Sequence, residues 1–150
     1  MRIIFASIIA ALVAAPAFAS DKTDALAAIH LFIDSMNKGD MKMAAGAYAP
    51  QSSILDEFPP HAWQGPATFA DWGKDFNDFA QKNGITDPVV TLGKVRQADI
   101  TGDRAYVVLS ATYSYKQHGK PISEPGCFMT YALQKLPAGW RITAWSWTRP

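Results

Sequence analysis

The last third of the chain alternates between apolar and polar residues in three long runs. Alternation with a period of two predicts half-buried β-strands, and the runs are Arg104–Gln117, Ile122–Leu136 and Trp140–Thr148. His118-Gly119 and Pro137-Ala138-Gly139 separate them, and glycine suits tight turns because it adopts positive φ at no steric cost. The sequence therefore predicts a three-stranded antiparallel meander.

The strand faces follow only in part from this alternation. The odd-numbered residues from 127 to 133 share one apolar face of the second strand. On the last strand, simple alternation puts Trp140 on one side and both Trp145 and Trp147 on the other, so the inward side stays undetermined. Strands this long usually bend at a bulge, and Pro125-Gly126 is the candidate position.

The residues before the meander favour helices with one short hairpin. Apolar residues at three- and four-residue steps predict a first helix from Thr23 or Asp24 to Asn37. Asp40 can cap a second helix, from Met41 to Tyr48, that Pro50 would stop. Residues 52–58 and 61–63 then read as a short hairpin, and a last strand before the meander spans 89–100.

A third helix starts after Gly65-Pro66 and carries an aromatic stripe. Its members recur at helical spacing and are Phe69, Trp72, Phe76 and Phe79. Such a stripe is core in most proteins. It becomes the wall of a pocket only if the sheet stands away from it.

The first 19 residues have the features of a secretory signal peptide. Arg2 supplies a positive charge, residues 3–13 form an apolar run, and Ala17-Phe18-Ala19 fits the small-x-small cleavage pattern. The run is shorter than the ~20 residues that span a membrane. We therefore expect export across the inner membrane to the periplasm, with one domain from residue 20 to 150 and no membrane span.

Composition excludes several classes of function. The chain has 14 Lys+Arg against 13 Asp+Glu and no basic run, which argues against a nucleic acid partner. Its single cysteine, Cys127, lies on an apolar strand face and reads as a small buried hydrophobe. The three histidines follow no metal-binding pattern, and no phosphate loop or dinucleotide fingerprint occurs. We expect neither a metal nor a cofactor.

Three short segments, in this order and spacing, resemble a known family. They are Asn37-Lys38-Gly39-Asp40 after the first helix, Asp56-Glu57-Phe58 before Gly65, and Gly139-Trp140-Arg141-Ile142 at the start of the last strand. The chain resembles the nuclear transport factor 2-like superfamily, in particular its SnoaL-like members. The resemblance implies a cone-shaped α+β fold, with a curved antiparallel sheet wrapped around about three N-terminal helices. It also implies an apolar cavity at the wide end and homodimers through the outer sheet face.

The superfamily includes steroid isomerases, cyclases and dehydratases, so its fold does not fix a function. Asp56 matches the position of the isomerase base, and Glu57 or His61 could join it in acid/base chemistry. The oxyanion donors of the isomerases do not carry over, since Phe32 and Thr130 stand at those positions. Asp56 and Glu57 could equally form an ion pair or lie in solvent at the hairpin rim, with His61 bonded to the backbone.

The sequence thus leaves three hypotheses. The leading one is a module that binds a small apolar molecule through an aromatic lining, with Thr130 as a polar contact. The lining residues would be Phe32, Trp63, Phe69, Trp72, Tyr113 and Tyr131. The second is a cofactor-free lyase, isomerase or cyclase using Asp56, Glu57 and His61. The third is an assembly module that uses an exposed sheet face around Trp145 and Trp147.

Overall fold

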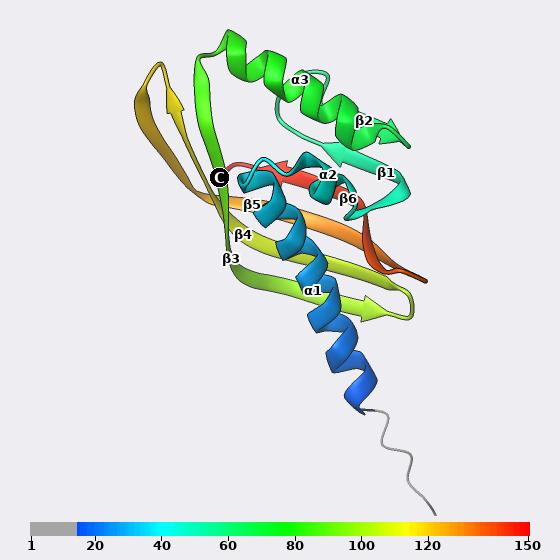
Figure 1. The fold of residues 1–150 in the computed structure, drawn as a ribbon. Coiled ribbons are helices and arrows are strands. Elements are labelled where there is room, and N and C mark those ends of the chain that lie inside the picture. Colours follow the sequence, from blue (N-terminus) through cyan, green and yellow to red (C-terminus); the bar gives the residue numbers. More distant parts are fainter. Residues whose placement is uncertain (1–14) are drawn as a thin grey trace, which may run out of the picture.

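A computed structural model describes residues 15–150 as helices on one side of a curved, six-stranded sheet (Figure 1). The elements in chain order are α1 (Ala15–Asn37), α2 (Met41–Ala45), β1 (Tyr48–Leu55), β2 (Ala62–Gly65), α3 (Thr68–Lys82), β3 (Ile85–Thr101), β4 (Arg104–Gln117), β5 (Lys120–Leu136) and β6 (Gly139–Thr148). The sheet order is β2-β1-β6-β5-β4-β3, and every neighbouring pair is antiparallel except β1 with β6. The predicted α+β class is confirmed.

The predicted meander is present as β4, β5 and β6. The β4 strand has the predicted bounds, whereas β5 begins two residues early, directly after the His118-Gly119 turn. Both turn residues have positive φ, 51° and 79°, as a hairpin turn of type I′ requires. This turn geometry keeps β4 and β5 paired up to the hairpin end, where Gln117 lies opposite Lys120.

Two bulges decide which side chains face the helices. The register of β4 with β5 shifts opposite Pro125-Gly126, so the predicted bulge is confirmed. A second shift leaves Thr143 of β6 without a partner on β5, and the Thr143 hydroxyl donates to the Ala132 carbonyl at 3.1 Å. This extra residue brings Trp145 and Trp147 to the same face as Trp140, which simple alternation does not predict.

Several element boundaries differ from the sequence prediction: β3 begins at Ile85 rather than at residue 89, and β1 spans Tyr48–Leu55 rather than 52–58. The α1 helix already includes Ala15, the first described residue, and so extends beyond the predicted start at Thr23 or Asp24. The α2 helix ends at Ala45 rather than Tyr48, and Pro50 lies inside β1. The register of β1 with β6 is interrupted between Tyr48 and Ser53, so the missing N–H of Pro50 removes no regular ladder bond.

The end of α1 is fixed to the sheet by the segment that carries the family resemblance. The Asn37 side chain donates to the Val90 carbonyl at 2.8 Å and accepts from the Val90 N–H at 3.0 Å. Asp40 caps α2 as predicted, through the Met43 N–H at 2.9 Å. These bonds hold the C-terminal half of α1 over β3.

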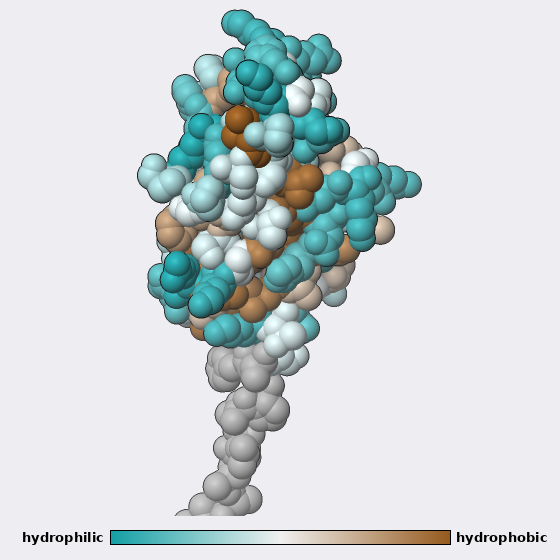
Figure 2. Space-filling view, turned by 90° about the vertical axis from the view of Figure 1, so that its left-hand side faces the viewer, coloured by the Kyte–Doolittle hydropathy of each residue, from teal (hydrophilic) through white to brown (hydrophobic). Residues whose placement is uncertain are grey.

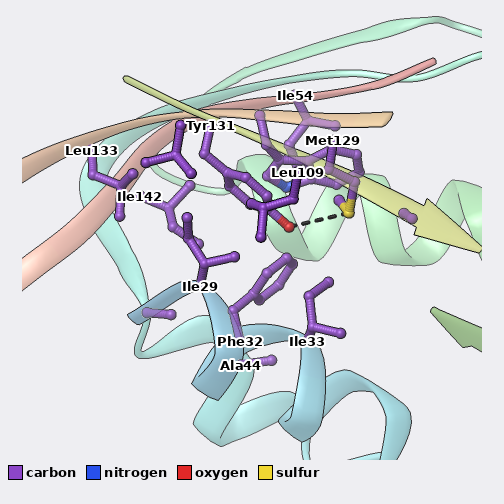
Figure 3. Close-up of a cluster of buried hydrophobic side chains, with 14 of the residues drawn as sticks. Ile29, Phe32, Ile33, Ala44, Ile54, Leu109, Met129, Tyr131, Leu133 and Ile142 are labelled. Carbon is purple, nitrogen blue, oxygen red and sulfur yellow. Dashed lines mark hydrogen bonds between the residues drawn. The ribbon is translucent and has the colours of Figure 1, made fainter. Parts of the chain in front are cut away.

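The packed core lies between α1 and the concave face of β4, β5 and β6. Ile29, Phe32 and Ile33 of α1 point toward Leu109, Met129 and Tyr131 of the sheet, and all six are almost completely buried (Figure 3). The Tyr131 hydroxyl bonds to the Met129 sulfur at 3.2 Å (Figure 3). On the side of the molecule shown in Figure 2, hydrophobic side chains form small separate clusters between polar ones.

The predicted signal peptide, residues 1–19, lies largely outside the described residues. Among residues 15–150, no helix combines the length and the apolar character that a membrane crossing needs.

Candidate ligand cavity

A cavity of about 610 Å³ opens between the C-terminal half of α1, the whole of α3 and the concave face of the sheet. Its apolar lining comes from helices and strands alike and includes Phe32, Met36, Phe58, Phe69, Trp72, Phe76, Phe79, Val90, Met129, Trp145 and Trp147. A volume of this size lies within the range of small-molecule sites in proteins. The sheet therefore stands away from the aromatic stripe of α3 along part of its length.

The aromatic side chains of α3 form a continuous stack along one wall. Phe69 stacks on Trp72 with ring centroids 5.9 Å apart, and Trp72 stacks on Phe76 at 5.4 Å. The edge of Trp72 also meets Trp145 of β6 at 5.3 Å and 81°. These contacts hold the wall rigid, since each ring is fixed by a neighbour on both sides.

Asp56 forms the polar end of the cavity, directly after β1. One carboxylate oxygen accepts from the Trp72 indole N–H at 3.0 Å, and the other accepts from the Glu57 backbone N–H at 2.7 Å. Burial raises the pKa of Asp56, and the two hydrogen bonds, Arg149 and His61 oppose that rise without cancelling it. Asp56 is therefore a half-buried carboxyl that holds its proton more tightly than one in water.

Arg149 joins two further carboxylates at the rim beside Asp56. Its guanidinium lies 2.6 Å from Glu57 and 3.3 Å from Glu124. The bulge at Pro125-Gly126 places Glu124 opposite Tyr113, and the Tyr115 hydroxyl donates to Glu124 at 2.9 Å. Burial raises the pKa of Glu57, and the Arg149 charge acts in the opposite direction.

Tyr113 carries a buried hydroxyl that has no hydrogen-bond partner among the described residues. Its ring lies 4.8 Å from that of Tyr115 and meets Trp147 edge-on at 5.9 Å. Burial raises the pKa of Tyr113, so the hydroxyl keeps its proton at neutral pH. An unsatisfied polar group on a cavity wall is available to a ligand, because nothing in the protein competes for it.

The structure brings together six of the ten residues singled out from the sequence. Phe32, Phe69, Trp72, Tyr113, Asp56 and Glu57 line the cavity. Trp63 lies behind Phe58 and donates to Asp75 at 2.9 Å, and Tyr131 is sealed in the packed core. Thr130 alternates with Met129 and Tyr131 and so faces the convex side of the sheet.

His61 is exposed, and its ring nitrogen lies 3.2 Å from the Asp56 backbone carbonyl. That contact matches the backbone-bonded alternative considered above rather than a place on the cavity wall. The expectation that Trp145 and Trp147 lie on an exposed sheet face is wrong. Trp145 is buried on the concave side and Trp147 lines the cavity, because of the bulge at Thr143.

Sequence reasoning missed Arg149 and Glu124. The positions of both residues depend on how the strands pair, which the alternation of apolar and polar residues does not reveal. The parallel pairing of β1 with β6 matches Leu55 with Ser146, so the two strands end together and Asp56 comes close to the residues after β6. A charged residue directly after the last strand was the available signal for Arg149.

Within the described part of the chain, no group of three or more His, Cys, Asp or Glu side chains is arranged to hold a metal ion. The polar end of the cavity instead consists of carboxylates, one guanidinium and tyrosine hydroxyls. These groups support hydrogen bonding and proton transfer.

Comparison with known proteins identifies relatives by structure alone. No family model and no curated protein sequence matches the chain. A nuclear transport factor 2-like superfamily protein from Salmonella enterica is 16% identical, with a TM-score of 0.73 over 89% of this chain and 94% of that one. An NTF2-like protein from Novosphingobium aromaticivorans is 15% identical, with a TM-score of 0.70 over 88% and 83%.

A ketosteroid isomerase-like protein from Erwinia carotovora atroseptica is 15% identical, with a TM-score of 0.65 over 86% of this chain and 95% of that one. A six-stranded, curved and open sheet around a few helices defines the cone-shaped class of α+β proteins. Within that class the chain has the nuclear transport factor 2-like fold, as the sequence resemblance indicated.

Proposed function

We propose that the protein binds a small, largely apolar molecule in the cavity between α1, α3 and the sheet. The observation that carries the proposal is the hollow of about 610 Å³, with aromatic walls and one polar end. Apolar burial stabilises such a complex by ~25 cal/mol per Å², and a few polar groups fix the orientation of the ligand.

Gly73 offers a test that leaves the fold intact. It lies inside α3 on the cavity wall, and an added Cβ there would meet no atom within 4 Å. Gly73→Leu should place a side chain in the hollow and reduce its volume, and it should stabilise the free protein by about 1 kcal/mol, because glycine is a poor helix former. Thermal-shift and calorimetric titration with phenylbutanol should show binding to the wild type and to Gly73→Ala, and weaker binding to Gly73→Leu. Equal binding by all three variants, or none by the wild type, would rule the proposal out.

A second candidate function is cofactor-free acid/base chemistry. Asp56 favours it, since a carboxyl in a cavity with a raised pKa is suited to take a proton from carbon and return it. Tyr113 supplies a donor for the oxyanion that would develop on a neighbouring carbonyl, a role that neither Phe32 nor Thr130 can fill. The reaction would be an isomerisation, in which Asp56 removes a proton next to the carbonyl and delivers it to another carbon of the same molecule.

One variant distinguishes the binding function from the catalytic function. Asp56→Asn should retain ligand binding and lose turnover of any substrate found in a screen of enolisable ketones. Tyr113→Phe should lose about 10²-fold in rate, which is typical of removing one oxyanion donor. Unchanged turnover in Asp56→Asn would exclude Asp56 as the base.

Export and self-association complete the proposal. The N-terminal pattern supports cleavage after Ala19 and a periplasmic location, which intact mass of the protein from the periplasmic fraction tests directly. The fold supports a homodimer through the convex face of the sheet. Light scattering at micromolar concentration should give twice the chain mass, and the chain mass alone would contradict the dimer.

A further inference from the structure

The polar end of the cavity carries more negative than positive charge. Asp56, Glu57 and Glu124 are gathered around the single guanidinium of Arg149, which contacts the latter two. Asp56 has no ion-pair partner within 4 Å in the described part of the chain, although His61 lies beside it on the connection to β2. Elsewhere on the lining, Lys74 lies 3.1 Å from Asp78 and 3.8 Å from Asp75. Among the lining carboxylates of the described residues, Asp56 is therefore the one without a cationic partner within 4 Å.

Hydrogen-bonding capacity at this end is also incomplete. Each oxygen of Asp56 accepts one bond from the protein, and a carboxylate can accept about four in all. The Tyr113 oxygen is buried and accepts none. A ligand group with several N–H donors would satisfy both residues at once, whereas a ligand carboxylate would add a like charge to three others.

Aromatic rings border the same place. Trp72 donates its indole N–H to Asp56, and Trp147 meets Tyr113 edge-on. A cation near the face of tryptophan or tyrosine is attracted by the ring quadrupole, and a neighbouring carboxylate adds a charge-assisted hydrogen bond. Rings and carboxylates around one end of an apolar hollow therefore favour a protonated amine.

Resting on the proposed binding function, we propose that the cavity selects cationic amphiphiles: molecules with an apolar body and a protonated primary or secondary amine. The body lies along Phe69, Trp72 and Phe76, and the ammonium group donates to Asp56 and Tyr113. Removing the ammonium from water is costly unless it meets a counter-charge, and Asp56 is the carboxylate in the hollow that lacks one.

Three probes with the same body and different head groups test the selection: phenylbutylamine, phenylbutanol and phenylbutyrate. Isothermal titration with the full-length folded protein at neutral pH should give a dissociation constant for the amine about tenfold lower than for the alcohol, with phenylbutyrate weakest. Equal affinity for amine and alcohol, or tighter binding of phenylbutyrate, would overturn the amine selection and leave the binding function standing. No binding of any probe would overturn both.

Asp56→Asn, with Asp71→Asn as its matched control, shows where the selection arises. Both substitutions remove one negative charge, but Asp71 lies on the exposed face of α3, away from the lining. Asp56→Asn should bring the amine to the affinity of the alcohol, and circular dichroism of the free variant reports on folding. Asp71→Asn should keep the full preference. A preference that survives Asp56→Asn, or falls equally in both variants, would overturn the assignment to Asp56.

Discussion

The two ends of the concave face have similar aromatic and aliphatic residues, yet one end is filled and the other is hollow. At the filled end, Ile29 of α1 packs against Leu109 and Tyr131, and all three are fully buried (Figure 3). At the hollow end, α3 stacks its rings on one another rather than against β4 and β5. The difference shows that hydrophobic content alone does not decide whether a face becomes core or cavity.

The polar residues and the bulges account for the difference. The Pro125-Gly126 bulge turns Glu124 inward, and the joint end of β1 and β6 adds Asp56, Glu57 and Arg149. Groups that require hydrogen bonds cannot be covered by leucine or phenylalanine without a large cost in free energy. The hollow persists where these groups meet the aromatic wall.

The largest expected effect comes from truncating one side chain at each end. Leu109→Ala removes a fully buried side chain and should lower the free energy of unfolding by about 3 kcal/mol. Phe76→Ala should cost only about 1 kcal/mol, because one side of its ring already faces the hollow. Urea unfolding of both variants measures this, and equal losses would mean that the two ends are packed alike.

Removing the cation at the rim should have the next largest effect. Arg149→Gln leaves Glu57 and Glu124 without their partner and should cost about 1 kcal/mol at neutral pH. The loss should shrink in acid as Glu57, whose pKa is raised by burial, becomes protonated and no longer needs a counter-charge. Arg104→Gln is the matched control, since its ion pair with Asp103 is well exposed, and its stability should be unchanged. Equal losses in the two variants would argue against a special role for Arg149.

The pH dependence of Asp56 follows from the direction of its shift. A pKa raised by burial means that the folded protein binds the proton more tightly than the unfolded chain. Its contribution to stability is therefore complete below the ordinary value of 3.8 and is lost as pH rises through the folded pKa. Arg149, His61, Glu57 and Tyr113 are the charged and titratable groups that interact with Asp56, and Glu57 loses one neighbouring negative charge in Asp56→Asn.

Asn does not titrate, so the melting temperature of Asp56→Asn should rise relative to wild type over that pH window. The change should correspond to about 1 kcal/mol or less, and differential scanning calorimetry across the acid range measures it. A wild-type advantage that grows with pH would mean that Asp56 has a lowered pKa instead.

The smallest expected effect is a difference in stability between variants of two nearby tyrosines. The Tyr113 hydroxyl has no partner, so Tyr113→Phe should leave stability unchanged or raise it by up to about 1 kcal/mol. The Tyr115 hydroxyl donates to Glu124, so Tyr115→Phe should lower stability by about 1 kcal/mol. Thermal unfolding of both variants decides this, and a loss in Tyr113→Phe would reveal a bond that the free hydroxyl makes.

Local patterns predicted the elements better than the site. Alternation and turn residues located β4, β5 and β6 to within two residues, because both depend on residues that are close together in the sequence. Asp56 and the aromatic stripe of α3 could also be predicted from the sequence. Asp56 follows from its position in the family resemblance, and the stripe follows from the helical spacing of its residues. The boundaries failed where tertiary contacts override local preference, as for Pro50 inside β1.

The remainder of the cavity depends on pairing between distant segments. Nothing near Arg149 in the sequence indicates Glu57 as its partner, because the parallel contact of β1 with β6 brings them together. Tyr131 was assigned to the lining without knowledge of how far the packed core extends, and it lies inside that core. Thr130 lies on the opposite face of the same strand and so points to the convex side of the sheet.

The unpaired Thr143 means that the length of the last strand controls which face its tryptophans occupy. Deleting Thr143 would restore regular alternation and move every later side chain of β6 to the opposite face, so that Trp145 and Trp147 would point outward. Deletion of one residue thus converts a sheet with tryptophans on its concave face into one with tryptophans on its exposed face. Lineages that share this architecture could exchange ligand chemistry for self-association by indels rather than by accumulating point substitutions.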